Sequence, residues 1–218
     1  MGWVRIRKTV FTSFLTYLRL TSFQYFMAGR GKLFIVSGPS GSGKSSLIND
    51  IVNESDDFVR SISVTTRPKR KDETSGRQYH FISKDEFEEL IEKDMLLEWS
   101  AYAGYLYGTP KKFVTEKLSK GKNVILVIEV QGAIQVIKKM KDTYLIFIAT
   151  SSFKELEERI KKRRTDSLEE MNKRLEIAKS ELNYKKYYDC IIVNNNYNEA
   201  LLNLKKVLDS QKGRKRHK

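Results

Sequence analysis

The 218-residue chain has one cysteine, two histidines and no apolar run long enough to cross a membrane. A single cysteine excludes an internal disulfide and is typical of a reducing compartment, so we expect a cytoplasmic protein. Cys190 lies in the apolar run 190–193, which predicts a buried structural thiol rather than a nucleophile. His80 is expected to be structural, and His217 lies in the tail. The chain also lacks internal repeats.

Acidic residues are absent from both ends of the chain. Residues 1–26 hold four basic residues, and the basic tail 212–218 holds five. These nine charges account for most of the formal net charge of +14 and leave +5 for residues 27–211. A modestly basic centre suits a site for polyanionic nucleotides. Because the excess charge lies in the ends and no base-stacking motif is present, we expect no specific nucleic-acid partner. The tail is expected to be solvated and disordered.

The segment 1–26 has three interpretations. Its basic, acid-free composition with many Thr, Ser, Phe, Leu and Tyr residues is compatible with an organelle transit peptide. Arg19 and several hydroxyl residues interrupt the apolar stretch, which argues against a secretory signal. The segment is also too short and too polar for a membrane span. We favour a misassigned start, with Met27 opening the protein, or a dispensable disordered extension.

A phosphate-binding loop is the most informative motif. The stretch Gly38-Pro39-Ser40-Gly41-Ser42-Gly43-Lys44-Ser45 fits the pattern G-x-x-x-x-G-K-[ST] at every fixed position. The apolar run 33–36 precedes it, and apolar residues at helical spacing follow it. A strand, this loop and a helix together form an anion site, because backbone N–H groups and the helix N-terminus face the phosphates. We expect Lys44 to contact the outer phosphates and the Ser45 hydroxyl to bind Mg²⁺.

From Met27 onward, apolar runs alternate with amphipathic stretches. The predicted strands are 33–37, 59–64, 79–82, 96–99, 123–128, 143–149 and 190–193. The predicted helices are 44–54, 84–93, 110–119, 131–140, 153–163, 168–185 and 197–209. Apolar strands alternating with helices predict an α/β fold whose parallel sheet is covered on both faces. The region 63–110 breaks the alternation, with short strands and aromatic, Gly-containing turns, and is typical of a binding insertion.

Several helices carry recognisable start signals. Ser83 with Glu86, Ser152 with Glu155, and Ser167 with Glu170 each fit a capping box. The pair Thr109-Pro110 predicts an N-cap followed by proline at the first helical position.

A loop with two arginines follows the second predicted strand. Arg67 and Arg70 lie three residues apart beside hydroxyl residues, and Tyr79 follows. Two arginines in one tight loop can bind a phosphate bidentately, and a tyrosine hydroxyl can donate a further bond. A solvated basic loop is the alternative.

Four blocks of this sequence, taken together, resemble guanylate kinases. The first is Thr65-Thr66-Arg67-x-x-Arg70-x-x-Glu73-x-x-Gly76-x-x-Tyr79, similar to the family's monophosphate-binding signature. The others are Leu97-Glu98-Trp99 with Gly104-x-x-Tyr107-Gly108-Thr109-Pro110, then Ile128-Glu129-Val130-Gln131-Gly132, then Arg159, Arg163 and Arg174. The resemblance runs from about Lys32 to about Leu208.

The resemblance implies the reaction ATP + GMP to ADP + GDP with Mg²⁺, on a P-loop nucleoside monophosphate kinase fold. It implies a core of residues 27–62 and 111–211, a small mixed α/β GMP-binding insertion of residues 63–110, and a short lid near 160–170. The partners expected are ATP and GMP, with dGMP as a further substrate, and no membrane. The oligomeric state is left open between a monomer and a homodimer.

The chemistry of guanine fits the acids in these blocks. Guanine presents adjacent N–H donors at N1 and N2, and a carboxylate such as Glu98 can accept from both. Adenine has an acceptor at N1 that would face the carboxylate, and the buried groups left unpaired would reject it. Glu129 could accept from the same guanine edge. Ser63 and Thr109 supply hydroxyls, and Tyr107 completes the expected GMP site.

The resemblance gives the remaining arginines a role in phosphoryl transfer. Lys44, Arg67, Arg163 and Arg174 are expected to stabilise the negative charge of the moving group. Arg159 is expected on the ATP side. Asn194, just past the last strand, falls where the family contacts adenine, although a turn residue is the alternative.

Two departures from the family pattern stand out. Val127 occupies a place where the family often has an acid, so Mg²⁺ would depend on Ser45, the phosphates and water. The proline of the arginine loop falls at Pro68, one place earlier than usual, which predicts a local change in the backbone path.

Three rival functions remain open: a kinase for another nucleoside monophosphate, a non-catalytic guanylate-kinase-like interaction domain, and a basic nucleic-acid-binding ATPase. The paired acids argue against the first, and the intact phosphate loop and lid arginines argue against the second.

Overall fold

The computed structural model describes residues 30–71, 73–162 and 168–212. Predictions for the N-terminal segment, Arg163, the Ser167 cap and most of the basic tail concern residues outside these ranges. None of the helices in the described ranges is long and apolar enough to cross a membrane.

The core is a parallel five-stranded sheet. Its strands are β1 (Leu33–Ser37), β2 (Phe58–Arg60), β7 (Asn123–Val127), β8 (Thr143–Ala149) and β9 (Cys190–Val193). Their spatial order is β2-β7-β1-β8-β9, and every neighbouring pair is parallel. All carboxyl ends therefore meet at one edge, where α/β folds bind ligands. The loops that carry Gly38, Glu129 and Asn194 all begin at this edge.

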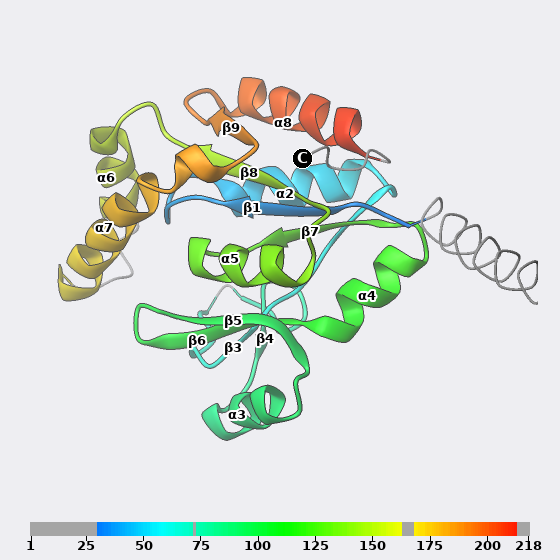
Figure 1. Cartoon of the computed structure of the whole chain (residues 1–218). Helices are drawn as coiled ribbons and strands as arrows, with labels where there is room; N and C mark the ends of the chain where they lie inside the picture. The colour runs from blue at the N-terminus through cyan, green and yellow to red at the C-terminus, as the bar shows by residue number, and fades with distance from the viewer. Residues whose placement is uncertain (1–29, 72, 163–167, 213–218) are drawn as a thin grey trace, which may run out of the picture.

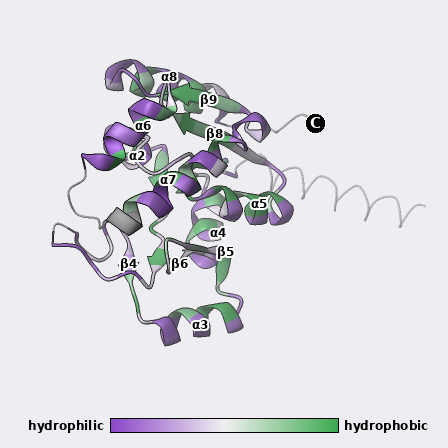
Figure 2. Ribbon diagram, turned by 90° about the vertical axis from the view of Figure 1, so that its left-hand side faces the viewer, coloured by the Kyte–Doolittle hydropathy of each residue, from purple (hydrophilic) through white to green (hydrophobic). Residues whose placement is uncertain are grey.

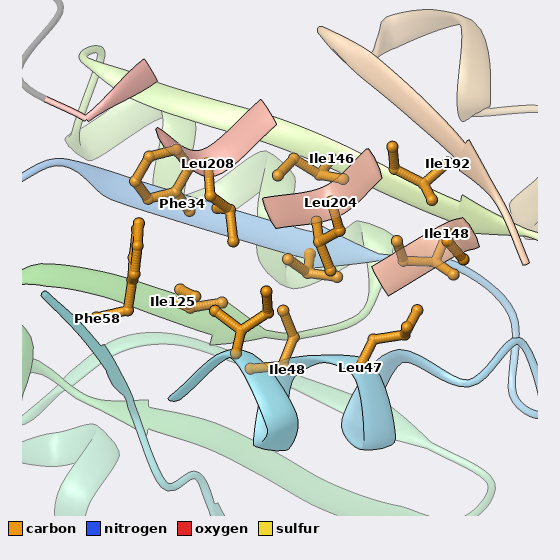
Figure 3. Close-up of a cluster of buried hydrophobic side chains, with 13 residues drawn as sticks. Phe34, Leu47, Ile48, Phe58, Ile125, Ile146, Ile148, Ile192, Leu204 and Leu208 are labelled. Carbon is orange, nitrogen blue, oxygen red and sulfur yellow. The ribbon is translucent and has the colours of Figure 1, made fainter. Parts of the chain in front are cut away.

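Helices cover both faces of this sheet (Figure 1). One face carries α2 (Lys44–Glu54) and α8 (Tyr197–Gln211), and the other carries α4 (Lys111–Ser119) and α5 (Val130–Lys139). Phe34, Ile146 and Ile192 of the sheet pack against Leu47 of α2 and Leu204 of α8 (Figure 3). The predicted α/β architecture is therefore confirmed, since both faces of the central strands β1, β7 and β8 are largely buried.

A second, four-stranded sheet lies beyond α5 and α4 (Figure 1). Its strands are β3 (Val64–Thr65), β4 (His80–Phe81), β5 (Leu96–Tyr102) and β6 (Tyr105–Pro110), in the order β4-β3-β6-β5. It is mixed, because β3 and β4 run parallel and the other pairs antiparallel.

One helix, α3 (Lys84–Glu92), covers this sheet and buries Phe87. In Figure 2 this helix shows both hydrophobic and hydrophilic colours, as one buried face requires. The Ser83–Glu86 capping box at its start is complete, as predicted.

Two helices lie at the carboxyl edge of the core sheet. They are α6 (Phe153–Lys161) and α7 (Leu168–Leu182), and the short 3₁₀ helix η1 (Lys185–Tyr187) follows. Leu156 and Ile160 of α6 pack against Ala178 of α7. Ser152 caps α6 as predicted, but the Glu155 carboxylate accepts from Ser151 and Arg159 instead of closing the box.

The prediction of one strand over 59–64 is wrong. β2 ends at Arg60 and belongs to the core sheet, and Ser61 N–H still donates to Ile125 O at 3.0 Å. The chain then crosses to the second sheet, where Val64 pairs with Gly108. Alternating side chains indicate extended backbone but not the sheet that it joins, so two short strands in line looked like one.

Strand β6 was not predicted. Tyr105–Pro110 contains a glycine and ends in proline, both unusual within strands. Its partner β5 reaches Tyr102, three residues beyond the predicted end. Ala103 (φ 49°) and Gly104 (φ 87°) join the two strands in a tight two-residue turn, which needs positive φ at both positions. Ala103 gave no signal for that turn.

Some helix ends differ from the predictions. α4 begins at Lys111, so Pro110 rather than Thr109 is the N-cap residue, and it makes no side-chain cap. α7 ends at Leu182 instead of residue 185, and α8 extends to Gln211. The Asn196 side chain caps α8 by accepting from the N–H groups of Asn198 and Glu199, a signal that the sequence analysis missed.

Candidate active site

A cavity of about 570 Å³ opens between the carboxyl edge of the core sheet and the second sheet. Of the predicted site residues, those that line it are Ser40, Gly41, Gly43, Lys44, Ser45, Ser63, Arg67, Arg70, Tyr79, Glu98, Tyr107, Glu129 and Arg174. Residues more than one hundred positions apart thus surround one space, as the sequence predicted. Gly38, Pro39, Ser42, Thr109, Arg159 and Asn194 lie outside the lining.

The phosphate loop joins β1 to α2 through left-handed glycines. Gly43 has φ 92°, and a Cβ atom there would lie 2.3 Å from the side-chain nitrogen of Asn194. At Gly38 (φ 141°) a Cβ would lie 2.1 Å from Ile148 O, so no larger residue fits without displacing the backbone. Asn194 also donates to Ser42 O at 2.8 Å and thereby supports the loop from β9.

Lys44 and Ser45 begin helix α2 at the cavity. The Lys44 ammonium donates to Gly38 O and, at 3.1 Å, to Pro39 O, so it is held over the loop. Ser45 is exposed to the cavity and Val127 lines it nearby. In the described part of the chain, no three His, Cys, Asp or Glu residues group as metal ligands. One hydroxyl fits Mg²⁺ held mainly by phosphates and water, because this ion keeps several waters.

The arginine loop is held by a carboxylate. Arg67 donates to Glu73 Oε1 at 2.7 Å and to Pro68 O at 2.8 Å, and Arg70 N–H donates to Glu73 Oε2 at 2.9 Å. Burial opposes the charge of Arg67, but Glu73 and Tyr107 together outweigh this effect and raise the pKa of the guanidinium. Burial likewise disfavours the charge of Glu73, yet its hydrogen bonds from Arg67 and Arg70 lower the pKa of that carboxyl. Both groups stay charged, and the loop is preorganised.

Aromatic rings support this arginine. The Arg67 guanidinium lies 5.6 Å from the centre of the Tyr79 ring and 5.5 Å from that of Phe81. Tyr79 meets Tyr107 edge to face at 5.7 Å. Burial raises the pKa of Tyr79, so its hydroxyl stays protonated and can donate.

Glu98 is a buried carboxyl, 3% exposed, that points toward helix α5. Thr109 donates to its Oε1 at 2.5 Å, and its Oε2 lies where a Cβ on Gly132 would sit, 2.3 Å away. Burial raises the pKa of Glu98 to about 7, although the bond from Thr109 lowers it. The charge of this group therefore depends on what hydrogen-bonds to it near neutral pH. Thr109 thus orients Glu98 from behind.

Glu129 is the N-cap residue of α5, directly after β7, and it lines the same cavity as Glu98. The two acids come from different sheets and face one space. They can accept adjacent N–H donors of a flat ring while Arg67, Arg70 and Tyr79 hold an anion.

Residues 30–211 match the family described as guanylate kinase. The chain belongs to the guanylate kinase family.

Curated guanylate kinases are similar over most of their length. The enzyme of a Synechococcus species is 44% identical over 181 residues, which cover 83% of each chain. That of Thermotoga maritima is 41% identical over 185 residues, covering 85% of this chain and 89% of the relative. The crystal structure of guanylate kinase from Anaplasma phagocytophilum superposes with a TM-score of 0.71 at 29% identity, covering 84% of this chain and 87% of that one. The fold is thus the P-loop nucleoside monophosphate kinase fold.

The arginines assigned from guanylate kinases occupy different environments. Arg174 of α7 lines the cavity. Arg159 lies behind the loop and donates to Asn194 O at 2.7 Å and to Glu155 Oε1 at 2.5 Å. Arg163 falls outside the described residues. The ATP-side roles of Arg159 and Asn194 stay predictions, since both side chains contact protein groups here.

Nine cavity residues were not predicted as site residues. They include Tyr102, Asn49, Arg60 and Ser100. Arg60 donates to Asn49 Oδ1 at 2.7 Å. A charged residue inside the predicted apolar strand 59–64 was the signal for Arg60. The position of Tyr102 depends on the β5–β6 turn, which the sequence did not reveal.

Proposed function

We propose that the chain transfers the γ-phosphoryl group of ATP to GMP and releases ADP and GDP. One observation carries this proposal: a phosphate loop, an arginine–tyrosine cluster and two acids from different sheets line a single cavity. The chain is an ATP:GMP phosphotransferase whose two substrates meet in that space.

The acceptor phosphate binds at the arginine loop. Arg67 and Arg70 neutralise its charge, and the Tyr79 and Tyr107 hydroxyls donate to its oxygens. Glu73 holds the Arg67 guanidinium and the Arg70 backbone N–H in place beforehand, so Arg67 loses little side-chain entropy on binding. Ser63 contributes a further hydroxyl to this end of the cavity.

Glu98 and Glu129 read the base. N1–H and the N2 amino group of guanine donate to these carboxylates, whereas adenine places an acceptor against them. Since Glu98 is buried and held by Thr109, it cannot swing away to solvent when the wrong base arrives. The ribose edge is not read by these residues, and we expect dGMP to be accepted.

The donor phosphates lie on the loop of residues 38–45, with Lys44 at their outer end and Arg174 facing them from α7. Both cations stabilise the charge that spreads over the moving phosphoryl group. Mg²⁺ bound by Ser45 and the phosphates would neutralise part of this charge. The acceptor phosphate is already an anion, so no general base is required. Closure of residues near 160–170, including Arg163, would exclude water and prevent hydrolysis.

The domain limits follow from this assignment: a core of residues 27–62 and 111–211, and a GMP-binding insertion of residues 63–110. The cytoplasmic location and the choice between a monomer and a homodimer stay predictions.

The decisive experiment is a phosphoryl-transfer assay with GMP, dGMP, AMP, UMP and dTMP as acceptors, with ATP and Mg²⁺. We expect strong preference for GMP, with dGMP second. Calorimetry of GMP binding, with AMP as the control, separates recognition from turnover. Preference for any pyrimidine or for AMP would refute the assignment, and GMP binding without transfer would indicate an interaction domain instead.

A further inference from the structure

A buried acid of helix α7 faces Glu129. Glu181, in the last turn of α7, is only 5% exposed, and its carboxyl group lies beside that of Glu129, because the adjacent residues Leu182 and Val130 pack in one buried cluster. Within the described ranges, Oε2 of each residue is buried and meets no donor. Two carboxylates in contact repel each other and cannot form a hydrogen bond. One proton converts one of them into a donor and removes the conflict.

The surroundings place that proton on Glu181. The backbone N–H of Val130 donates to it, and Lys44 attracts its negative form, but burial and the charge of Glu129 dominate. Together these raise the pKa of Glu181 far above the ordinary carboxyl range. The hydroxyls of Tyr102 and Tyr188, whose pKa values burial raises, face the pair from β5 and from the chain after η1. Glu181 is therefore a neutral carboxylic acid at physiological pH.

Only one member of this pair reaches the substrate. Glu129 lines the cavity and Glu181 does not. A carboxylic acid that donates to Glu129 fixes the orientation of that carboxyl group. The remaining Glu129 oxygen is then held where it can accept from guanine.

Glu181 also connects the guanine site with the donor site. Arg174 lies seven residues earlier on α7, two helical turns away and on the same side of the helix. Arg174 lines the cavity while Glu181 contacts Glu129. A shift of Glu129 therefore acts on the helix that carries a donor-side arginine.

We propose that Glu181 is a positioning residue that donates a hydrogen bond to Glu129, orienting the guanine-binding carboxylate and joining it to the helix that carries Arg174. This inference rests on the proposed function. It follows that GMP and ATP strengthen each other's binding through this contact, because each favours the same position of α7.

The test compares Glu181→Gln and Glu181→Ala with Glu176→Ala, an exposed acid on the same helix. A glutamine amide still donates to Glu129 while its carbonyl accepts from Val130, so E181Q should keep wild-type KM values at pH 7.5. E181A should raise the KM for GMP about tenfold, the loss of roughly one hydrogen bond to a charged group. E181A should also abolish the tightening of GMP binding by a non-hydrolysable ATP analogue. E176A should change neither quantity.

The pH dependence gives a second readout. Between pH 8 and pH 10 the wild type loses the proton of Glu181 and the E181Q variant does not. The GMP dissociation constant of the wild type divided by that of E181Q should therefore rise across that range. The titration of guanine itself affects both constants equally and cancels in this ratio. A ratio that stays flat overturns the inference even if E181A fails to fold, as does an E181A variant with unchanged GMP affinity. A wild-type protein that does not prefer GMP over AMP would refute the proposed function instead.

Discussion

Thirteen buried side chains pack between the five-stranded sheet and helices α2 and α8, and eleven more pack on its other face. In the four-stranded sheet, only three buried side chains form the corresponding cluster among the described residues: Val64, Phe87 and Leu96. The phosphate loop is therefore supported by a large apolar core, while the proposed acceptor site is supported by a small one. Local stability follows buried apolar contact, so we expect the two halves to differ in rigidity.

The second sheet is joined to the core by Leu97, which packs in the core cluster, and by polar contacts from α5. Gln135 accepts from Trp99 N–H at 3.2 Å and donates to Trp99 O at 2.6 Å, and Lys139 donates to Leu97 O at 2.6 Å. These side chains satisfy backbone groups on the outer edge of β5, which is the last strand of its sheet. We therefore expect the proposed acceptor site on this sheet to adjust on binding more readily than the proposed donor site.

The largest effect is expected for Phe87→Ala. Removing this fully buried ring from a three-residue cluster should cost about 3–5 kcal/mol and release the second sheet preferentially. Hydrogen exchange should show lost protection in β3–β6 while β1 and β8 stay protected. Leu47→Ala, in the core cluster, should lower protection in both sheets. Equal loss in both sheets for Phe87→Ala would mean that the two halves unfold as one unit.

Lys44→Ala tests the phosphate loop, which is supported by the five-stranded sheet. Turnover should fall about 10²–10³-fold, because one preorganised cation on the transferred group is lost, while the melting temperature and GMP affinity stay unchanged. Lys84→Ala, an exposed lysine on α3, is the control. Near-normal turnover in Lys44→Ala would contradict the role of the phosphate loop.

Glu98→Gln tests the proposed acceptor site on the four-stranded sheet. The variant should lose about 1.5–3 kcal/mol of GMP binding free energy, the range for a hydrogen bond to a charged group, and the KM for GMP should rise accordingly. The KM for ATP should stay constant. Because the pKa of Glu98 in the free protein is about 7 and guanine donors favour its ionised form, GMP binding at pH 6.5 should release a proton.

Calorimetry in buffers of different ionisation enthalpy measures that proton, and the Glu98→Gln variant should lack it. The raised pKa also means that folding stability falls as pH rises from the ordinary carboxyl pKa through 7, since the folded form binds the proton more tightly. A release that persists in the variant would remove Glu98 from the base site.

Gln135→Ala should give the smallest effect. It deletes the two bonds to Trp99 and should destabilise the edge of β5 by about 1 kcal/mol, raising the KM for GMP a few-fold. Gln131→Ala, at an exposed position one turn earlier, should change nothing. Loss of ATP affinity alone would show that α5 supports the donor site and not the insertion.

The core could be predicted from the sequence because its central strands β1, β7 and β8 are apolar over most of their length. An apolar run such as 143–149 predicts a buried strand. The phosphate-loop motif likewise predicts where the backbone needs glycine. The residues on both sides of the cavity could also be named, since each belongs to a motif of fixed spacing.

The second sheet was harder to predict because its register depends on partners far apart in sequence. Val64 pairs with Gly108, and neither residue indicates the other. The cavity positions of Tyr102 and Arg60, and the contact of Glu181 with Glu129, arise only after folding. Hydrophobic periodicity along one segment does not reveal that an acid on one helix contacts an acid at the start of another helix.

Gly132 has a consequence for how base selectivity could change. It touches no substrate, yet its missing side chain leaves the space that Glu98 Oε2 occupies, 2.3 Å from where a methyl carbon would sit. Alanine at this position is a small step for a helix and would favour its formation. It would nonetheless displace the carboxylate that we propose binds the guanine edge, so the proposed discrimination between purines depends on one vacant carbon position that no inspection of ligand contacts would reveal.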